Sequence, residues 1–315
     1  MSLPPIIFCQ LGKVIPPYLQ DAMEQARLFN QNAEIILLTD AEISGVENKR
    51  YEKIKLHVIH PQDIPQTERH QNFLKLSFLP QYQPSHFWQT TTERLYLLDD
   101  YLEDRKIDEA FHIESDCLLY QNLADYLSIF RKNYPGLAAT PMSPIHLTAS
   151  LFYVSNRSQL ADFTKESNRL LALGEKKLKD DFGIDRPGDM TLLWIYQHLH
   201  GQKVLGSLPM APDAPEDWHI EDFGCLYDGN PWGQYIGGIT SKPEPGYYWE
   251  FQVIGTRLKN RKYKILWRND SQDRKIPHVA FRTKLNDWTG YRFCKTWPFG
   301  LLHVHNKKTE LYRSF

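Results

Sequence analysis

The sequence has no long apolar run and no secretion signal. No stretch reaches the roughly 20 apolar residues that a membrane span needs. The first residues do not show the basic-then-apolar pattern of a signal peptide. We therefore expect a soluble, cytoplasmic protein without a transmembrane segment, and a peripheral membrane contact is left open.

Paired cysteines and an excess of charge are also absent. The four cysteines, at positions 9, 117, 225 and 294, lie far apart, which predicts neither a zinc site nor a disulfide framework. Thirty-seven Lys and Arg face 38 Asp and Glu, a formal charge of −1, which argues against nucleic acid as a partner. The Lys- and Arg-rich stretch 256–275 could suit nucleic acid or anionic lipid, but we interpret it as a solvated face.

What is present suffices for a large α/β core. The chain has 315 residues, 42% of them hydrophobic, and no linker-like or repeated segment, which favours one domain. A strand, a helix and a second strand are predicted at 4–11, 17–30 and 33–38, an order typical of a right-handed parallel unit. The other predicted strands are 55–60, 136–140 and 146–154, and the other predicted helices are 87–105, 123–132, 156–179 and 190–200.

The stretch AFHIESDCLLY, residues 110–120, is the most informative motif. Its first apolar run ends in two carboxylates, Glu114 and Asp116, which an extended backbone would place on the same side. Two such charges repel each other unless a cation lies between them. Mg²⁺ and Mn²⁺ prefer oxygen ligands and often share them with a substrate phosphate. The pair predicts a metal–diphosphate anchor, and the alternative is a solvated turn between two strands.

Further polar residues are predicted to lie near this turn. Gln10 and Asp40 follow strands whose carboxyl ends meet at the edge where ligands bind. Arg94, on a predicted helix, could hold a diphosphate, or form a surface ion pair with Glu93 or Asp99. Asp189 stands where a helix N-cap belongs and could also act as a base.

A row of basic residues closes the chain. On a strand, His303, His305 and Lys307 would share one face. Imidazole can complete a Mn²⁺ shell, and lysine neutralises phosphate. We predict a site role for at least one of the three, although a lone histidine is usually structural.

With these motifs the chain resembles the GT-A fold glycosyltransferases, the nucleotide-diphospho-sugar transferase superfamily. Three pieces carry the resemblance: IIFCQLG…AEIILLTD, the strand that ends in Glu114-Ser115-Asp116, similar to the family's Asp-x-Asp motif, and the terminal HVHNKK. The loop 224–238, rich in glycine and aromatic residues, looks like one in bacterial polysaccharide-type members. The resemblance implies a Rossmann-like α/β fold with a mixed, mostly parallel central sheet flanked by helices. It also implies a nucleotide-binding half, 1–120, and an elaborated acceptor-side half, 121–315.

The resemblance further implies a metal-dependent enzyme of polysaccharide biosynthesis. It would move a sugar from a UDP- or GDP-sugar to a hydroxyl of a glycan or lipid-linked saccharide, with Mn²⁺ or Mg²⁺ as cofactor. The implied roles are Asp116 and His303 or His305 as metal ligands, Gln10 and Asp40 at the nucleoside, Arg94 and Lys307 at the diphosphate, and Asp189 facing donor sugar or acceptor. Glu114 departs from the family's first Asp, and its longer arm would contact ribose or metal-bound water.

Two alternatives remain. A sugar-phosphate nucleotidyltransferase would have a similar sheet, but its glycine-rich loop is represented here by a single glycine, Gly12. A non-catalytic module that binds a nucleotide sugar or a glycan would explain Glu114 as a sign of decay. Such a module would bind without releasing nucleoside diphosphate.

Overall fold

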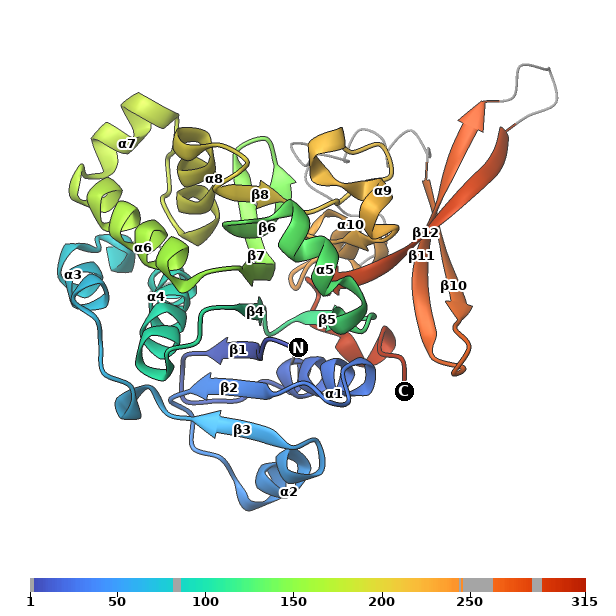
Figure 1. Ribbon diagram of the computed structural model, residues 1–315, viewed down its shortest axis with the longest axis horizontal. Helices are drawn as coiled ribbons and strands as arrows, with labels where there is room; N and C mark the ends of the chain where they lie inside the picture. The colour runs from blue at the N-terminus through green and yellow to red at the C-terminus, as the bar shows by residue number, and fades with distance from the viewer. Residues whose placement is uncertain (1–2, 82–85, 244, 246–262, 285–290) are drawn as a thin grey trace.

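A seven-stranded sheet forms the centre of the molecule. The computed structural model describes residues 3–81, 86–243, 245, 263–284 and 291–315. The strands of the sheet lie in the order β3-β2-β1-β4-β7-β6-β8 (Figure 1). Their bounds are β1 (Ile6–Gln10), β2 (Ile35–Thr39), β3 (Leu56–Ile59), β4 (Ala110–Ile113), β6 (Leu137–Ser143), β7 (His146–Val154) and β8 (Leu205–Ser207).

The sheet is mixed and mostly parallel. The pairs β1–β2, β2–β3, β1–β4 and β6–β8 are parallel, whereas β4–β7 and β6–β7 are antiparallel. Helix α1 (Pro17–Phe29) connects β1 to β2, with Pro17 at its first position, where a missing N–H costs nothing. The predicted α/β class and the predicted strand–helix–strand unit are therefore confirmed.

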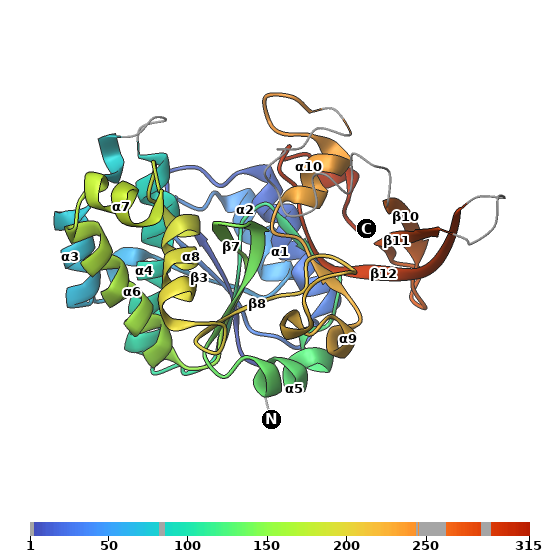
Figure 2. The same cartoon turned by 90° about the horizontal axis from the view of Figure 1, so that it is seen from above.

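Helices cover both faces of this sheet. Side chains alternate along β1, so Ile7 and Cys9 join one core while Ile6 and Phe8 join the other. The first core also receives side chains from α3 (Glu68–Leu76), α4 (Phe87–Arg105), α6 (Arg157–Ala172), α7 (Glu175–Phe182) and α8 (Asp189–His200), which Figure 2 groups on one side. The second core receives side chains from α1, α2 (Gly45–Lys53) and α5 (Leu123–Asn133).

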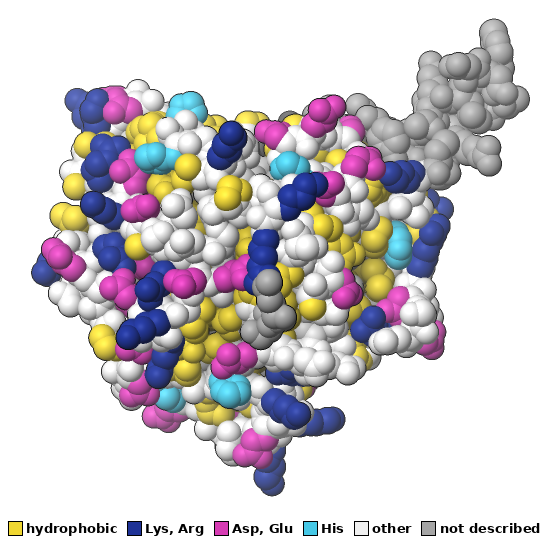
Figure 3. Space-filling model, viewed as in Figure 1, with side chains coloured by type: hydrophobic (Ala, Val, Ile, Leu, Met, Phe, Trp, Pro, Cys, Tyr) yellow, Lys and Arg dark blue, Asp and Glu magenta, His cyan; other side chains and the backbone are white. Residues whose placement is uncertain are grey.

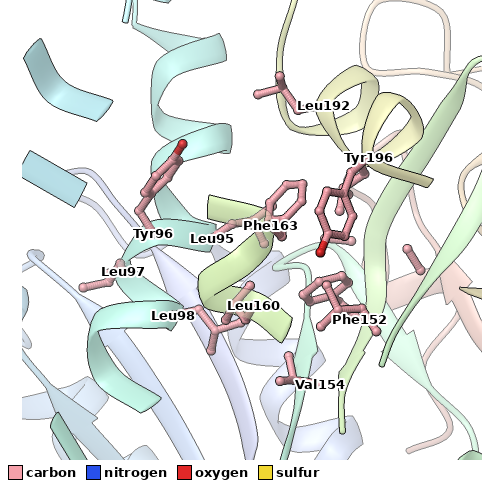
Figure 4. Close-up of a cluster of buried hydrophobic side chains, with 14 of the residues drawn as sticks. Leu95, Tyr96, Leu97, Leu98, Phe152, Val154, Leu160, Phe163, Leu192 and Tyr196 are labelled. Atoms are coloured by element: carbon pink, nitrogen blue, oxygen red, sulfur yellow. The ribbon is translucent and has the colours of Figure 1, made fainter. Parts of the chain in front are cut away.

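The first core fixes α4 and α8, the two helices that carry Arg94 and Asp189. Leu95 and Leu98 of α4 and Leu192 of α8 pack with Phe152 of β7 and Phe163 of α6 (Figure 4). All five side chains are at most 1% exposed. Burying a large apolar side chain contributes about 1.5–3 kcal/mol, so this core holds α4 and α8 in fixed positions on the sheet.

A second sheet lies beside the first. It has the order β10-β11-β12-β5, and β9 also pairs with β12. Its strands are β5 (Cys117–Leu119), β9 (Leu226–Tyr227), β10 (Tyr263–Asn269), β11 (Lys275–Lys284) and β12 (Tyr291–His303). The long strand β12 runs from the outlying end of this sheet back to β5 (Figure 1). The division into a nucleotide-binding half and an acceptor-side half at residue 120 stays a prediction. Strand β12 of the second half pairs with β5 of the first, so the two parts share one sheet.

Two predicted segments differ from the structure. The helix expected at 156–179 is divided into α6 and α7, because Gly174 adopts a φ of 80° that leaves the helical path. The segment 224–238 is not a loop throughout. It contains β9 and the short helix α10 (Pro231–Gly237), which begins with a proline, as helices often do. The short helix α9 (Ile220–Phe223) precedes it.

The surface intersperses charges of both signs. On the face drawn in Figure 3, basic and acidic side chains alternate, as the net charge of −1 suggests. In the basic stretch, Lys264, Arg268 and Lys275 are exposed, whereas residues 256–262 lie outside the described residues. Among the helices of the described ranges, none combines the length and the apolar character that crossing a bilayer requires.

Candidate active site

The acidic pair lies in a turn between β4 and β5. The backbone N–H of Cys117 donates to the carbonyl of Glu114 over 3.1 Å and closes this turn. The predicted extended geometry of the pair is therefore wrong. The turn nevertheless directs both carboxylates into one cavity, where Glu114 is 7% and Asp116 5% exposed. This burial also contradicts the alternative of a solvated turn.

His303 reaches the acidic turn because β12 pairs with β5. In this antiparallel register His303 lies opposite Cys117. Its Nε2 lies 3.0 Å from Oδ2 of Asp116, and its Nδ1 lies 3.5 Å from Oε2 of Glu114. The hydroxyl of Ser150, on β7, lies 3.1 Å from Oε2 of Glu114 and 3.0 Å from Nδ1 of His303. The pairing of β12 with β5 thus brings His303 next to the acidic turn that Glu114 and Asp116 form.

The basic row does not form a strand face. Strand β12 ends at His303, and Lys307 follows in a turn with a φ of 64°. This turn lets the Lys307 ammonium contact Oδ2 of Asp116. The ring of His305 stacks on that of His303, with centroids 6.0 Å apart, and burial beside His303 and Lys307 lowers the pKa of His305 to about 4. All three residues line the cavity, but by another geometry than predicted.

Arg94 and Asp189 complete the charged network. Nη2 of Arg94 contacts Glu114 and lies 2.6 Å from Oδ2 of Asp189. The alternative pairing with Glu93 or Asp99 is wrong, since Arg94 points into the cavity. Asp189 is the first residue of α8 and Gly188 holds the N-cap position, so the predicted N-cap is displaced by one residue.

The network separates the carboxylates by their proton affinity. Burial favours the neutral form of each. For Glu114, Arg94 and His303 outweigh burial and hold the pKa below its ordinary value. For Asp116, His303 and Lys307 hold the pKa well below its ordinary value despite burial. For Asp189, burial outweighs Arg94 and raises the pKa. Groups shifted in opposite directions within one cleft are typical of functional sites.

A buried aspartate fixes the end of β12. The carboxylate of Asp228 accepts hydrogen bonds from the backbone N–H groups of Asn230, Trp232, Gly233 and His303, at 2.9, 3.1, 2.8 and 3.2 Å. A Cβ at Gly233 would overlap the carbonyl oxygen of His303, so only glycine lets α10 lie this close. No role of Asp228 was predicted from the sequence, although Asp-Gly-Asn-Pro is a turn signal that could have indicated one.

These side chains surround a cavity of about 360 Å³ beyond the carboxyl ends of β1 and β4. Gln10, the last residue of β1, lines it as predicted. Asp40 is exposed and absent from its lining, and Oδ1 of Asp40 accepts a hydrogen bond of 2.6 Å from the N–H of Gly12. The contact of Asp40 with a nucleoside therefore stays a prediction.

Several lining residues and the bridging Ser150 were not predicted from the sequence. Thr148 and Tyr18 line the cavity, and the ring centroid of Tyr18 lies 5.2 Å from Nζ of Lys307. Thr148 and Ser150 are two residues apart on β7 and so share one face. Two hydroxyl residues at this spacing inside an otherwise apolar strand are the signal that could have identified them.

A divalent cation fits the donor set. Ligand atoms of Glu114, Asp116, Cys117 and His303 all lie within 4.8 Å of one another. Two carboxylates and an imidazole suit Mn²⁺ or Mg²⁺. Burial raises the pKa of the Cys117 thiol well above its ordinary value, so Cys117 stays protonated and is a poor ligand for a hard ion.

Another hollow is larger, but the metal-binding cluster found among the described residues does not line it. About 1060 Å³ of space lies beside the segment that precedes β1 and beside Glu34, which precedes β2, at the amino ends of these strands. Its Arg131 pairs with Glu109 at 2.6 Å, so these charges satisfy each other. Ligands of parallel sheets bind at the opposite, carboxyl end. We therefore place the site in the smaller cavity.

Comparison with known proteins gives structural likeness alone. No protein-family model and no curated protein sequence matches the chain. Mouse xyloside xylosyltransferase 1, apo form, aligns with a TM-score of 0.47 at 8% identity, over 65% of this chain and 85% of its own. The galactosyltransferase LgtC, in complex with donor and acceptor sugar analogues, gives 0.39 at 15% identity, over 65% and 73%. A cytidylyltransferase from Leptospira borgpetersenii gives 0.33 at 10% identity, over 57% and 74%.

Two of these three structures are glycosyltransferases by name, and each aligns at a TM-score below 0.5. The likeness is partial, so it assigns no residue a role. We base the function on the side chains of the site.

Proposed function

We propose that this chain transfers a sugar from a UDP- or GDP-sugar to a hydroxyl of a glycan or lipid-linked saccharide. The observation that carries the proposal is the convergence of Glu114, Asp116 and His303 with Lys307 in one cavity. Oxygen ligands for a hard cation and an ammonium for phosphate are the two kinds of group that a bound diphosphate needs.

The contacts support the following proposed roles. Asp116 and His303 would hold Mn²⁺ or Mg²⁺, with Glu114 beside them on ribose or metal-bound water. The bound ion would neutralise charge on the departing diphosphate. Lys307 adds a fixed positive charge next to Asp116, and such preorganised charge lowers the barrier where negative charge develops.

Asp189 would accept the proton of the acceptor hydroxyl if the reaction inverts the sugar's configuration. It lines the cavity at the start of α8, and Arg94 fixes its carboxylate at 2.6 Å. A general base works best when its pKa approaches the working pH. Burial raises the pKa of Asp189 in that direction.

Asp116→Asn tests the proposal. We expect release of nucleoside diphosphate from UDP- or GDP-sugars in Mn²⁺ to fall about 100-fold, which corresponds to about 2.7 kcal/mol of lost charge stabilisation. The Mn²⁺ dependence of nucleotide binding should disappear as well. Asp180→Asn, at an exposed position of α7, is the matched control. An Asp116→Asn variant with unchanged rates would remove the metal-anchor role.

The same assays separate the alternatives. A nucleotidyltransferase would release pyrophosphate from a nucleoside triphosphate and a sugar 1-phosphate, whereas a binding module would bind UDP- or GDP-sugars without turnover. Nucleoside diphosphates that raise the melting temperature more with Mn²⁺ than without it would identify the donor base, because a ligand of the native state stabilises it.

A further inference from the structure

A second cavity adjoins the first. It has a volume of about 690 Å³, and Trp88 and Met190 line both cavities. The first turn of α8 separates them: Asp189 lines the first cavity, whereas Gly188 and Thr191 line the second. The carboxylate that we propose as the base therefore stands on the ridge between the two spaces.

The interior of the second cavity is uncharged. Ile145, Ile184 and Met190 give it an apolar lining, and its two charged residues, Asp185 and Arg186, are both exposed. Charge is thus confined to the rim, which disfavours an acidic ligand deep inside.

Two polar groups inside are compatible with an uncharged ligand. Nδ1 of His146 lies 2.6 Å from the hydroxyl of Ser143, and burial lowers the pKa of His146, so its ring is neutral near pH 7. The Thr191 hydroxyl accepts from the N–H of Gly188 over 2.9 Å and donates to the carbonyl of Gly188 over 3.0 Å, so it can offer a ligand only its second lone pair. A mostly apolar lining with a few polar groups is typical of ligand cavities of about 300–1,000 Å³.

Trp88 forms the apolar side of the ridge. A Cβ at Gly188 would lie 3.0 Å from Cε3 of Trp88, so the indole packs directly against the backbone at the start of α8. The indole Nε1 is buried and has no hydrogen-bond partner among the described residues.

We propose that the second cavity is the acceptor subsite and that it binds a neutral saccharide, with one sugar ring against Trp88 and the reactive hydroxyl directed across the ridge to Asp189. The inference rests on the proposed function. In an inverting transfer, the hydroxyl oxygen bonds to the anomeric carbon of the donor as the bond from that carbon to the diphosphate breaks. The hydroxyl proton passes to Asp189, and the nucleoside diphosphate leaves with the electron pair.

The test is a substitution that reduces the volume of the second cavity. It is made at Ile145, which lines the second cavity but not the first. Ile145 is 38% exposed, so Ile145→Trp adds bulk without removing a buried core residue. Leu199→Trp is the matched control, because Leu199 is 43% exposed near the end of α8 and lines neither cavity. The melting temperature of each variant verifies folding.

Two measurements are made on each variant. The first is the ratio of transfer to donor hydrolysis with UDP- and GDP-sugars in Mn²⁺. Its probes are methyl glycosides of glucose, galactose, mannose and xylose, and octyl glucoside to detect a preference for a lipid-like tail. The second is saturation-transfer NMR of the same glycosides without donor. We expect Ile145→Trp to lower the ratio at least tenfold, to raise the acceptor KM and to abolish the NMR signal, and Leu199→Trp to match the unmodified chain.

A ratio within twofold of the unmodified chain in Ile145→Trp would overturn the assignment of the cavity. Stronger binding of methyl glucuronide than of the neutral glycosides would overturn the ligand class. No release of nucleoside diphosphate from any donor, with glycoside binding intact and lost in Ile145→Trp, would instead overturn the transfer reaction and leave a saccharide-binding cavity.

Discussion

Replacing Arg94 with methionine measures how strongly the charges of the site depend on one another. A single nitrogen, Nη2, contacts Glu114 and lies 2.6 Å from Asp189. The side chains of Arg94, Glu114 and Asp189 are 13%, 8% and 3% exposed. Arg94→Met keeps a comparable apolar length but leaves both carboxylates buried without this cation.

The expected loss of unfolding free energy is about 3–5 kcal/mol at pH 7.5, the cost of removing one partner from a buried ion pair. A typical domain has about 5–15 kcal/mol in total. The loss should shrink as the pH falls. In the unmodified chain Arg94 lowers the pKa of Glu114. Its contribution to the stability of the fold is therefore complete above the ordinary pKa of the carboxyl and is lost as the pH falls below that value. In the variant, burial raises the pKa values of Glu114 and Asp189, so both accept protons before the unfolded chain does, and the penalty declines toward pH 5.

Urea unfolding followed by circular dichroism, with a chelator present, measures this at pH 7.5 and 5.0. Arg169→Met is the control, because Arg169 is 56% exposed and its pair with Glu166, at 2.6 Å, lies on the surface. Such pairs contribute at most about 1 kcal/mol. A loss below about 1 kcal/mol in Arg94→Met, or a loss that is equal at both pH values, would refute the reasoning.

Two further predictions concern stability. Burial opposes protonation of His70, but Asp100 and Glu93 raise its pKa to about 9. The contribution of protonated His70 to the stability of the fold is therefore complete below pH 6.5, the pKa of a free histidine, and is lost as the pH rises through 9. His70→Gln should lower the melting temperature more at pH 6 than at pH 9.5, and equal losses would contradict this. Gly233→Ala should cost about 3 kcal/mol or more by overpacking against His303. Gly45→Ala, in open space, should be nearly neutral in the same thermal melts, and similar melting temperatures of the two variants would disprove the close packing.

Elements with a strong local signal were predictable. Helix α4 and strand β7 have the bounds expected from the sequence, 87–105 and 146–154, because each is a continuous periodic or apolar run. Helix α2 escaped prediction because its sequence is almost entirely polar. Its signal is instead the capping box of Ser44 and Glu47, which satisfies N–H groups at the helix start.

The residue types of the site were predictable, but their contacts were not. The acidic pair, Arg94 and the C-terminal basic residues all line one cavity. Their geometry depends on the pairing of β12 with β5 and on the packing of α4 against α6 and α8, which no local pattern specifies. For this reason the strand face through Lys307 and the surface pairing of Arg94 were wrong, although the residues themselves were identified.

The pairing of β5 with β12 also determines when, during synthesis of the chain, the charged network of the site can be completed. Lys307 and its partner Asp116 are 191 positions apart in the chain. A polypeptide still emerging from the ribosome can pair Arg94 with Glu114, but Asp116 has no lysine beside it until β12 has docked and placed Lys307. A proteolytic cut that released the last dozen residues would leave most of the core intact and remove Lys307. Under the proposed function, loss of the segment that carries Lys307 should therefore weaken diphosphate binding.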